Sequence, residues 1–378
     1  MRQKMTDNNT NSRRDFVRKL GMGAAASAAV VATGCSSSSQ ECDTGEEAVK
    51  KFNWKMVTSW PKNFPGLGTG AEYLAKSITE MSGGRLTVKL YAAGELVPAF
   101  EVFDAVSRGT AEMGHAAAYY WKGKVPAAQF FTAVPFGLNA TEMSAWLHEA
   151  GGLDLWRKLY APFNIVPFQS GNTGVQMGGW YNKEINSVDD LKGLKIRMPG
   201  LAGEVIQRMG GTPLTIPGGE LFTALQSGAI DATEWVGPWN DMAFGFHKAA
   251  KYYYYPGWHE PGPALEATIN KDAWETLPAD LQQIVEVACK ASTQKMLDEY
   301  TANNNRALNS LVNEHDVQLR KFPDEVLAAL KVTTDSVLED LAETDETSRE
   351  IYESFTEFRD QVAEWHKVSE VAYFDTRK

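Results

Sequence analysis

Two separated segments of similar sequence, 101–109 and 220–228, carry apolar residues at intervals of three and four positions. This spacing predicts a short amphipathic helix in each segment, and each segment closes on a glycine, Gly109 or Gly228. A short apolar stretch with one acidic residue follows each glycine and predicts a core strand. A helix–strand unit that occurs twice indicates two similar lobes, although two surface helices can also resemble each other by chance. A cleft between two lobes is a common place for a small ligand.

Strands and helices alternate in the rest of the pattern. Strands are predicted at 52–58 and 86–91, with a helix at 69–81 between them. A short helix, a glycine and a strand follow one another again within 189–197, and the pattern is helical from residue 273 onward. This alternation predicts an α/β fold with mainly parallel sheets.

The last predicted helix carries an apolar stripe along one face. Its members recur at spacings of three and four residues: Ile351, Phe355, Phe358, Val362, Trp365 and Val368. Such a stripe packs across a lobe or pairs with a second subunit, and the pattern alone leaves both alternatives open.

The chain has 378 residues, more than one typical domain and suitable for two. Its formal charge is −11, but residues 1–34 hold six basic and two acidic side chains, so the remainder carries −15. An acidic body argues against nucleic acid and anionic membranes as partners. It does not argue against a small anion, which responds mainly to its own pocket.

Residues 1–34 have the pattern of an export signal. Arg13 and Arg14 precede a mildly apolar run at 20–32 that is rich in alanine. The adjacent arginines resemble the twin-arginine type, which exports folded proteins, and a basic amphipathic tail is the alternative. Cys35 follows Gly34 and precedes four serines, as in a lipoprotein cleavage site, so lipid anchoring and simple cleavage both fit. Residues 35–51 are predicted to be a polar linker, and the folded part is expected to cover 52–378.

No motif of a known catalytic type occurs in the chain. The six histidines have no metalloprotease or zinc spacing, the three cysteines form neither a zinc motif nor a disulfide framework, and no nucleophile elbow or Walker loop is present. The segment Gly66-Leu67-Gly68-Thr69-Gly70-Ala71 fits a relaxed dinucleotide fingerprint, but no acidic residue ends the following strand to bind a ribose. We interpret this segment as a flexible turn.

Arg197 is the first candidate for ligand binding. It lies at the carboxyl end of a predicted strand, on the face opposite Leu194, Ile196 and Met198, and Pro199 follows the strand. Open α/β sheets bind ligands at that end, and a guanidinium can hold a carboxylate through two parallel hydrogen bonds. A solvated surface arginine is the alternative.

Two glutamates are candidates for the same cleft. Glu234 follows the second repeat, and Glu260 follows a run of four tyrosines that suits a half-buried wall. Two carboxylates in one cleft repel each other unless a positive charge neutralises them, and a hard cation does so with carboxylate and amide oxygens as ligands. Gln176 can supply an amide oxygen. If the glutamates are instead exposed, they are unrelated to each other.

Three segments carry a resemblance to a known family: Thr58-Ser59-Trp60-Pro61, 191–197, and 224–235. Together they resemble the DctP-like solute-binding proteins of TRAP transporters, from about residue 52 to the end. The Glu234-Trp235 pair, with Gln176 and Glu260, looks like the branch that binds 2-oxo acids or lactate together with a metal ion.

The resemblance implies a type II-like periplasmic binding protein with two α/β lobes, mixed sheets, a long inter-lobe helix and C-terminal helices. Lobe I would cover about 52–170 plus a later return segment, and lobe II about 171–260 plus part of the C-terminal half. It further implies partners and a location: a membrane permease, the periplasm and, for some relatives, a homodimer.

The resemblance also implies roles for individual residues. Arg197 would pair with the substrate carboxylate, and Tyr119 and Tyr120 would line the pocket from the other lobe. A sodium or calcium ion would be held by the side chains of Gln176, Glu234 and Glu260 and by the main chain of Trp235, with Gln176 and Trp235 also facing the substrate. The leading hypothesis is therefore a carrier that closes on a small monocarboxylate and performs no catalysis. The alternative is an exported enzyme with a cofactor.

Overall fold

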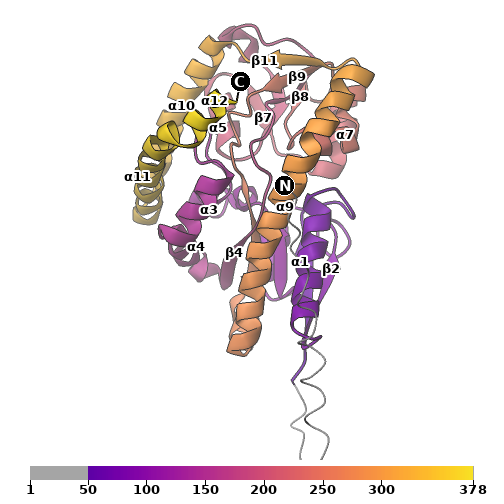
Figure 1. The fold of residues 1–378 in the computed structure, drawn as a ribbon, viewed down its shortest axis with the longest axis vertical. Coiled ribbons are helices and arrows are strands. Elements are labelled where there is room, and N and C mark those ends of the chain that lie inside the picture. The colour runs from indigo at the N-terminus through magenta and orange to yellow at the C-terminus, as the bar shows by residue number, and fades with distance from the viewer. Residues whose placement is uncertain (1–49, 378) are drawn as a thin grey trace, which may run out of the picture. The chain divides into compact units, whose positions relative to one another are not determined.

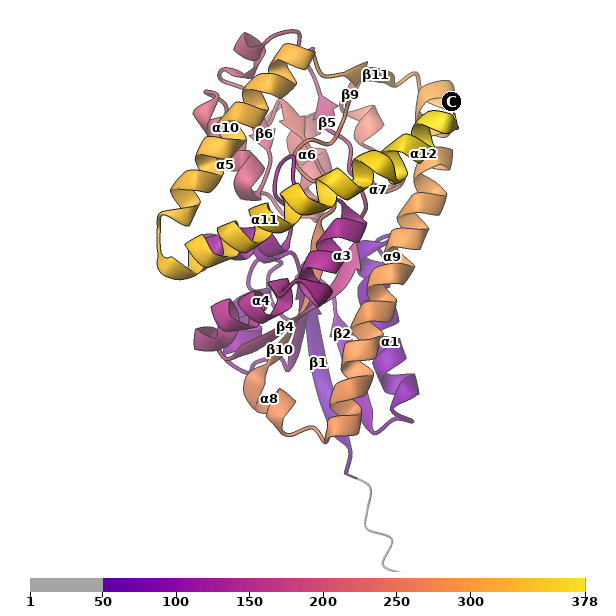
Figure 2. The same ribbon diagram turned by 60° about the vertical axis from the view of Figure 1, so that its left-hand side comes forward.

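The computed structural model describes residues 50–377, which belong to one compact unit. The predicted signal sequence and the possible lipid site at Cys35 lie outside the described residues, as does nearly all of the predicted linker. The described chain forms two sheets, each with its own helices, and therefore two lobes (Figures 1 and 2).

Lobe I is built on a five-stranded sheet in the order β2-β1-β3-β10-β4. Its strands β1, β2 and β3 pair in parallel, whereas β10 runs antiparallel to both of its neighbours. The elements of this lobe are β1 (Phe52–Thr58), α1 (Leu67–Met81), β2 (Leu86–Tyr91), α2 (Val102–Ser107), β3 (Met113–Ala116), α3 (Ala140–Glu149), α4 (Gly152–Tyr160), β4 (Ile165–Asn172), β10 (Ala264–Asn270) and α8 (Lys271–Glu275).

Lobe II is built on a six-stranded sheet in the order β11-β9-β5-β8-β6-β7. Only β5 runs antiparallel to its neighbours, β8 and β9. The elements are β5 (Gly179–Tyr181), β6 (Lys195–Arg197), α5 (Gly200–Arg208), β7 (Thr212–Leu214), α6 (Leu221–Gln226), β8 (Ala232–Thr233), α7 (Pro238–Phe244), β9 (Tyr252–Tyr255), β11 (Gln318–Lys321) and α10 (Asp324–Ala342).

Three further helices complete the C-terminal part. The 36-residue helix α9 (Ala279–Glu314) packs on α1 and β4 of lobe I and on α7 of lobe II, so it spans both lobes (Figure 2). Helix α11 (Glu346–Val368) packs on α3, α4 and α10, and α12 (Glu370–Thr376) extends it. The predicted inter-lobe helix and C-terminal helices are thus present. None of the helices in the described part of the chain has the length and apolar character needed to cross a membrane.

The two repeated segments occupy equivalent positions in the two lobes. They form α2 in lobe I and α6 in lobe II, and each helix is followed by a glycine with positive φ, 73° at Gly109 and 74° at Gly228. An L side chain rarely adopts this conformation, which explains why glycine stops both helices. The following strands, β3 and β8, are both fully buried. The repeated segments therefore form the same helix–strand unit in each of the two lobes, as the pattern predicts.

The glycine-rich segment 66–71 is not the flexible turn that we expected. Gly66 caps α1, and Gly68 and Gly70 lie inside this helix. A Cβ on Gly70 would lie 2.4 Å from the Met296 methyl carbon, and one on Gly66 would lie 2.5 Å from the Tyr300 hydroxyl. These glycines therefore allow α1 to approach α9 closely.

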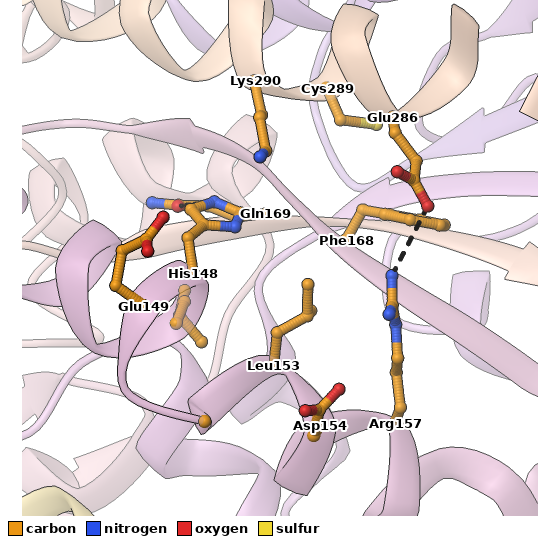
Figure 3. Close-up of a pocket in the computed structure, with 12 residues that line it drawn as sticks. His148, Glu149, Leu153, Asp154, Arg157, Phe168, Gln169, Glu286, Cys289 and Lys290 are labelled. Atoms are coloured by element: carbon orange, nitrogen blue, oxygen red, sulfur yellow. Dashed lines mark hydrogen bonds and ion pairs between the residues drawn. The ribbon is translucent and has the colours of Figure 1, made fainter. Parts of the chain in front are cut away.

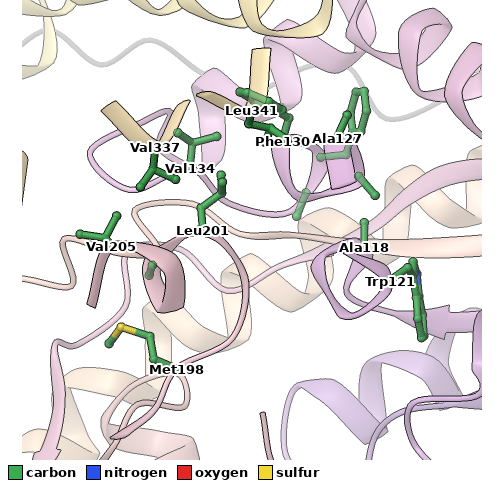
Figure 4. Close-up of a cluster of buried hydrophobic side chains, with 14 of the residues drawn as sticks. Ala118, Trp121, Ala127, Phe130, Val134, Met198, Leu201, Val205, Val337 and Leu341 are labelled. Atoms are coloured by element: carbon green, nitrogen blue, oxygen red, sulfur yellow. The ribbon is translucent and has the colours of Figure 1, made fainter. Parts of the chain in front are cut away.

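Apolar side chains of both lobes pack together on one side of the cleft. In Figure 4, Val337 and Leu341 of α10 lie beside Val134 and Phe130, and Leu201 and Val205 of α5 face this group. The two lobes also meet through polar groups, because the Lys122 ammonium lies 3.3 Å from the Glu204 carboxylate. The structure therefore shows the lobes in contact across the cleft.

Candidate functional site

Arg197 is fully buried at the carboxyl end of β6, where only 1% of its surface is exposed. Its Nη1 donates to the Glu234 carboxylate, its Nε to the Ile216 carbonyl at 3.3 Å, and its Nη2 to the Tyr120 hydroxyl at 3.4 Å. The guanidinium also lies 5.0 Å from the centre of the Trp235 ring. Burial opposes the charged form, but the Glu234 carboxylate together with Tyr120, Tyr119 and Glu260 outweighs it, so the pKa of Arg197 is raised. The alternative of a solvated surface arginine is excluded.

Glu234 and Glu260 are buried as well, and both face the same site. Glu234 directly follows the carboxyl end of β8, whereas Glu260 lies in the segment 256–263 that leads from β9 to β10. Burial and the nearby Glu234 carboxylate raise the pKa of Glu260 well above its usual range. The alternative that the two glutamates are exposed and unrelated is therefore wrong.

Gln176 lies beside Glu260 because two crossing segments between the lobes touch. The chain passes from β4 to β5 through 173–178 and returns from β9 to β10 through 256–263. The Gln176 main-chain N–H donates to the Glu260 main-chain carbonyl at 3.1 Å, and a Cβ on Gly257 would lie 2.1 Å from the Gln176 main-chain carbonyl oxygen. Glycine at 257 thus permits this approach, and the site sits at the crossing between the lobes.

Three buried side-chain oxygens at this crossing have no hydrogen-bond partner among the described residues: Gln176 Oε1, Glu234 Oε2 and Glu260 Oε2. Leaving a buried acceptor unpaired is costly, so such atoms in a native site call for a ligand. Two carboxylate oxygens and one amide oxygen are the kind of ligand atoms that a hard cation prefers. The residues present therefore fit a sodium or calcium ion.

His259 belongs to the same cluster, and the sequence reading missed it. Single atoms of Glu234, His259 and Glu260 all lie within 4.8 Å of one another. The His259 Nε2 lies 3.6 Å from Glu234 Oε2, and neither ring nitrogen has a hydrogen-bond partner in the described structure. Its place directly before Glu260 was the available signal, but a lone histidine in a turn is not specific.

Aromatic side chains from both lobes form the walls around these groups. Tyr119 and Tyr120 come from the short helix after β3, and their ring centres lie 4.8 Å apart. Trp60, which we did not predict as a site residue, lies edge-on to Trp235 with centres 6.4 Å apart. The space enclosed by the walls is small, about 10 Å³, close to the volume a single water needs. The lobes are therefore closed around the site.

A buried histidine fixes the position of Trp60. The Trp60 indole N–H donates to His115 Nδ1 at 2.8 Å, and His115 Nε2 lies 2.8 Å from the Ser170 carbonyl. Burial lowers the pKa of His115 to about 4, so this imidazole is neutral at pH 7. Since Nδ1 accepts from Trp60, the proton is on Nε2 and is donated to Ser170.

A larger cavity of about 350 Å³ lies between α3, α4, β4 and α9. Figure 3 shows that its lining mixes both signs of charge: Arg157 faces Glu286 at 3.8 Å, and Lys290 lies across from Asp154. His148 is held by Gln169, with 3.1 Å between His148 Nε2 and the Gln169 amide oxygen. None of the predicted site residues lines this cavity. We therefore place the functional site at the crossing between the lobes.

All seven predicted site residues meet at that crossing. Tyr119, Tyr120, Gln176, Trp235 and Glu260 line the small space, and Arg197 and Glu234 contact each other beside it. The ring of Trp235 covers the guanidinium, whereas the ligand role of its main chain stays a prediction.

The model of the DctP family, the bacterial extracellular solute-binding proteins of family 7, matches residues 56–345. The chain belongs to this family. The family comprises the periplasmic solute-binding components of TRAP transporters, and its assignment agrees with the two-lobed fold. The predicted resemblance is thereby confirmed.

Individual relatives are similar over nearly the whole folded part. The monocarboxylate 2-oxoacid-binding periplasmic protein of Nostoc sp. is 44% identical over 361 residues, which cover 96% of this chain and 97% of the relative. A TRAP periplasmic solute-binding protein from Pseudoalteromonas atlantica, solved with sodium and pyruvate, is 44% identical in sequence and superposes with a TM-score of 0.84. The matched region covers 86% of this chain and 99% of that protein's chain. The counterpart from Colwellia psychrerythraea, solved with calcium and pyruvate, is 46% identical with a TM-score of 0.84, covering 86% and 100%.

Proposed function

We propose that this solute-binding protein captures a small monocarboxylate, a 2-oxo acid such as pyruvate or the related lactate, together with a sodium or calcium ion. It would then deliver the ligand to the membrane permease of its TRAP transporter. The observation that carries the proposal is the pairing, around one small closed space, of a buried guanidinium with three unpartnered buried oxygens. The ligands of the relatives from Nostoc, Pseudoalteromonas and Colwellia agree with it.

Each side of the site would hold a different part of the ligand. Arg197 would bind the carboxylate, because its fork of N–H groups matches two carboxylate oxygens. Gln176, Glu234, Glu260 and the Trp235 main chain would hold the cation. When bound, the cation supplies positive charge that attracts the carboxylate and 2-oxo oxygens of the ligand.

Lobe closure would be the working step. Tyr120 of lobe I and Arg197 of lobe II approach to 3.4 Å, so a ligand on Arg197 would contact both lobes only when they are shut. Binding therefore favours the closed state by the difference in affinity between the two states. The walls formed by Trp60, Tyr119 and Trp235 would exclude water. They carry no positively charged side chain that could pair with a second carboxylate of the ligand.

The family is a transport component, and we infer that the chain performs no catalysis. The exported-enzyme alternative predicts a bound nucleotide or redox metal in the purified protein, and the glycine-rich segment 66–71, the candidate nucleotide fingerprint, packs against α9 instead. The twin-arginine type of the signal, the lipid on Cys35 and the lobe boundaries near residues 170 and 260 stay predictions.

A homodimer formed through the C-terminal helices is part of the proposal. The predicted stripe is buried at Ile351 and Phe355 but exposed at Trp365 and Val368, at 62% and 72%. Tyr373 and Phe374 of α12 are more than half exposed as well. The structure of a relative from Bordetella bronchiseptica, 39% identical with a TM-score of 0.85 and covering 87% of this chain and 97% of its own, is a dimer.

Isothermal titration calorimetry tests the proposed ligand class. The dialysed protein is titrated with pyruvate, lactate and succinate, each in calcium and in sodium buffers. We expect pyruvate or lactate to bind with Kd of about 1 μM or tighter, near −8 kcal/mol, and succinate to bind far more weakly. If no monocarboxylate binds with either ion, the proposed function is wrong.

A further inference from the structure

The Glu234 carboxylate is shared between two competing roles. One oxygen, Oε1, accepts from Arg197 Nη1. The other, Oε2, has no hydrogen-bond partner in the described structure and lies in the cluster with His259 and Glu260 that could hold a cation. Glu234 thus contacts both the proposed carboxylate-binding group and the proposed cation site.

The Arg197 guanidinium has no free edge for a ligand in this arrangement. Nε donates to the Ile216 carbonyl, Nη1 to the Glu234 side chain and carbonyl, and Nη2 to the Tyr120 hydroxyl. Two-pronged recognition of a carboxylate needs two parallel N–H groups. The Nε side is held by the Ile216 main-chain carbonyl, so the edge that side-chain movement can free is the one formed by Nη1 and Nη2. A ligand carboxylate on this edge displaces Glu234 from Nη1, whereas the weaker contact to Tyr120, at 3.4 Å, yields more readily.

The charges favour the same conclusion. Arg197 contributes one positive charge to this site, and Glu234 and Glu260 are the two acidic groups that face it. A monocarboxylate that enters alone adds a third acidic group against a single guanidinium, in a place where burial weakens screening. A displaced Glu234 also needs a new partner, because an unpaired buried charge is costly.

We propose that Glu234 exchanges between Arg197 and the cation, so that the Arg197–Glu234 pair keeps the site closed to carboxylates until the ion is present. The inference rests on the proposed function and adds a binding rule to it. With the ion bound, Glu234 turns its carboxylate toward the ion and releases Nη1 for the ligand. Ion and ligand then raise each other's affinity by the same factor, as linkage requires.

The test measures pyruvate affinity of the full mature protein by calorimetry, in 1 mM calcium and in a calcium-free choline buffer with chelator. Tryptophan fluorescence gives a second readout, since Trp235 covers Arg197. For the wild type we expect calcium to tighten pyruvate binding at least ~10-fold, and pyruvate to tighten calcium binding by the same factor.

Two carboxyl-to-amide variants separate the exchange from the mere loss of an acidic side chain in the site. Glu234→Gln removes the competitor for Arg197, so pyruvate affinity without ion should exceed that of the wild type, and the gain from calcium should fall below ~3-fold. Glu260→Gln makes the same carboxyl-to-amide change in the same site but leaves the Arg197–Glu234 pair. The rise in ion-free pyruvate affinity should therefore be clearly larger for Glu234→Gln than for Glu260→Gln.

Several outcomes would overturn the exchange. One is a wild-type pyruvate affinity that is equal with and without ion, a result that requires no variant to fold. Another is a rise in ion-free affinity that is as large for Glu260→Gln as for Glu234→Gln. Both leave pyruvate bound, and so the proposed function stands. If neither pyruvate nor lactate binds the wild type in calcium or in sodium, the proposed function itself fails.

Discussion

Replacing Arg197 by alanine tests the charge balance of the site. The substitution leaves the buried carboxylate of Glu234 without its partner, because His259 approaches only to 3.6 Å. Breaking a buried ion pair costs about 3–5 kcal/mol of unfolding free energy. For a chain of this length that corresponds to a fall in Tm of roughly 4–7 °C. Loss of the charged contact should also weaken pyruvate binding by about 2–5 kcal/mol, or ~30-fold to several thousand-fold.

Thermal melting followed by circular dichroism and calorimetry with pyruvate measure both effects. Arg208→Ala is the matched control, because Arg208 pairs with Asp340 at 2.6 Å on the surface, with side chains 37% and 61% exposed. Exposed pairs contribute less than about 1 kcal/mol, so this variant should melt and bind like the wild type. An Arg197→Ala protein that binds pyruvate within twofold of the wild type, with an unchanged Tm, would refute the reasoning.

Three further predictions concern residues around the site. Burial raises the pKa of Glu266 to about 7, although the hydrogen bonds from Trp121 and Tyr160 act in the opposite direction. Between about pH 4.5 and 7 the folded state therefore keeps a proton that the unfolded state has lost. The unfolding free energy should fall as the pH rises through this range. Glu266→Gln should abolish this fall and exceed the wild type at pH 8 by up to ~3 kcal/mol in urea titrations; equal pH profiles of the two proteins would contradict it. Asn240 of α7 donates to the Pro65 carbonyl at 2.9 Å across the lobes. Asn240→Ala should therefore weaken pyruvate binding ~3- to 10-fold and raise the radius of gyration of the ligand-free protein in small-angle scattering. An unchanged radius of gyration would count against a role of this contact in holding the lobes together. Gly200 has φ 69°, and a Cβ there would lie 3.2 Å from the Tyr119 ring; Gly200→Ala should cost about 1–2 kcal/mol of stability, seen as a lower Tm, while an equal Tm would show that Tyr119 yields freely.

The elements with strong periodicity could be predicted from the sequence. The strands at 52–58 and 86–91 have the observed bounds of β1 and β2, because β-forming apolar residues occur at alternate positions in both and Gly83-Gly84 precede the second. The repeat predicted two lobes because the same helix, glycine and strand occur twice. The glycine can be recognised in both copies since each helix ends on a residue with positive φ. Strand β11 was missed, as it is a half-exposed edge strand whose residues Gln318–Lys321 show no alternation and pair with β9 far away in the chain.

The candidate site could be predicted only in part. The position of Arg197 at the end of a core strand follows from pattern alone. The meeting of Gln176 with Glu260 depends on a close approach of two crossing segments at Gly257, which no local pattern reveals, and the family resemblance supplied it. Trp60, His115 and His259 were missed because their roles arise from packing between distant segments.

The contact between Arg197 and Glu234 could not be foreseen either. The resemblance assigned the two residues to different partners, a carboxylate and a cation, whereas the structure pairs them with each other. Two opposite charges that are buried side by side pair directly, because a buried carboxylate without a partner is costly.

A crystal structure of the protein grown with pyruvate and calcium, with the ion located by its anomalous scattering, tests the central claim most directly. We expect the pyruvate carboxylate on Arg197, the ion among Gln176, Glu234 and Glu260, and Glu234 turned away from Nη1. An ion or a pyruvate bound elsewhere, for instance in the cavity beside Arg157 and Lys290, would contradict the account.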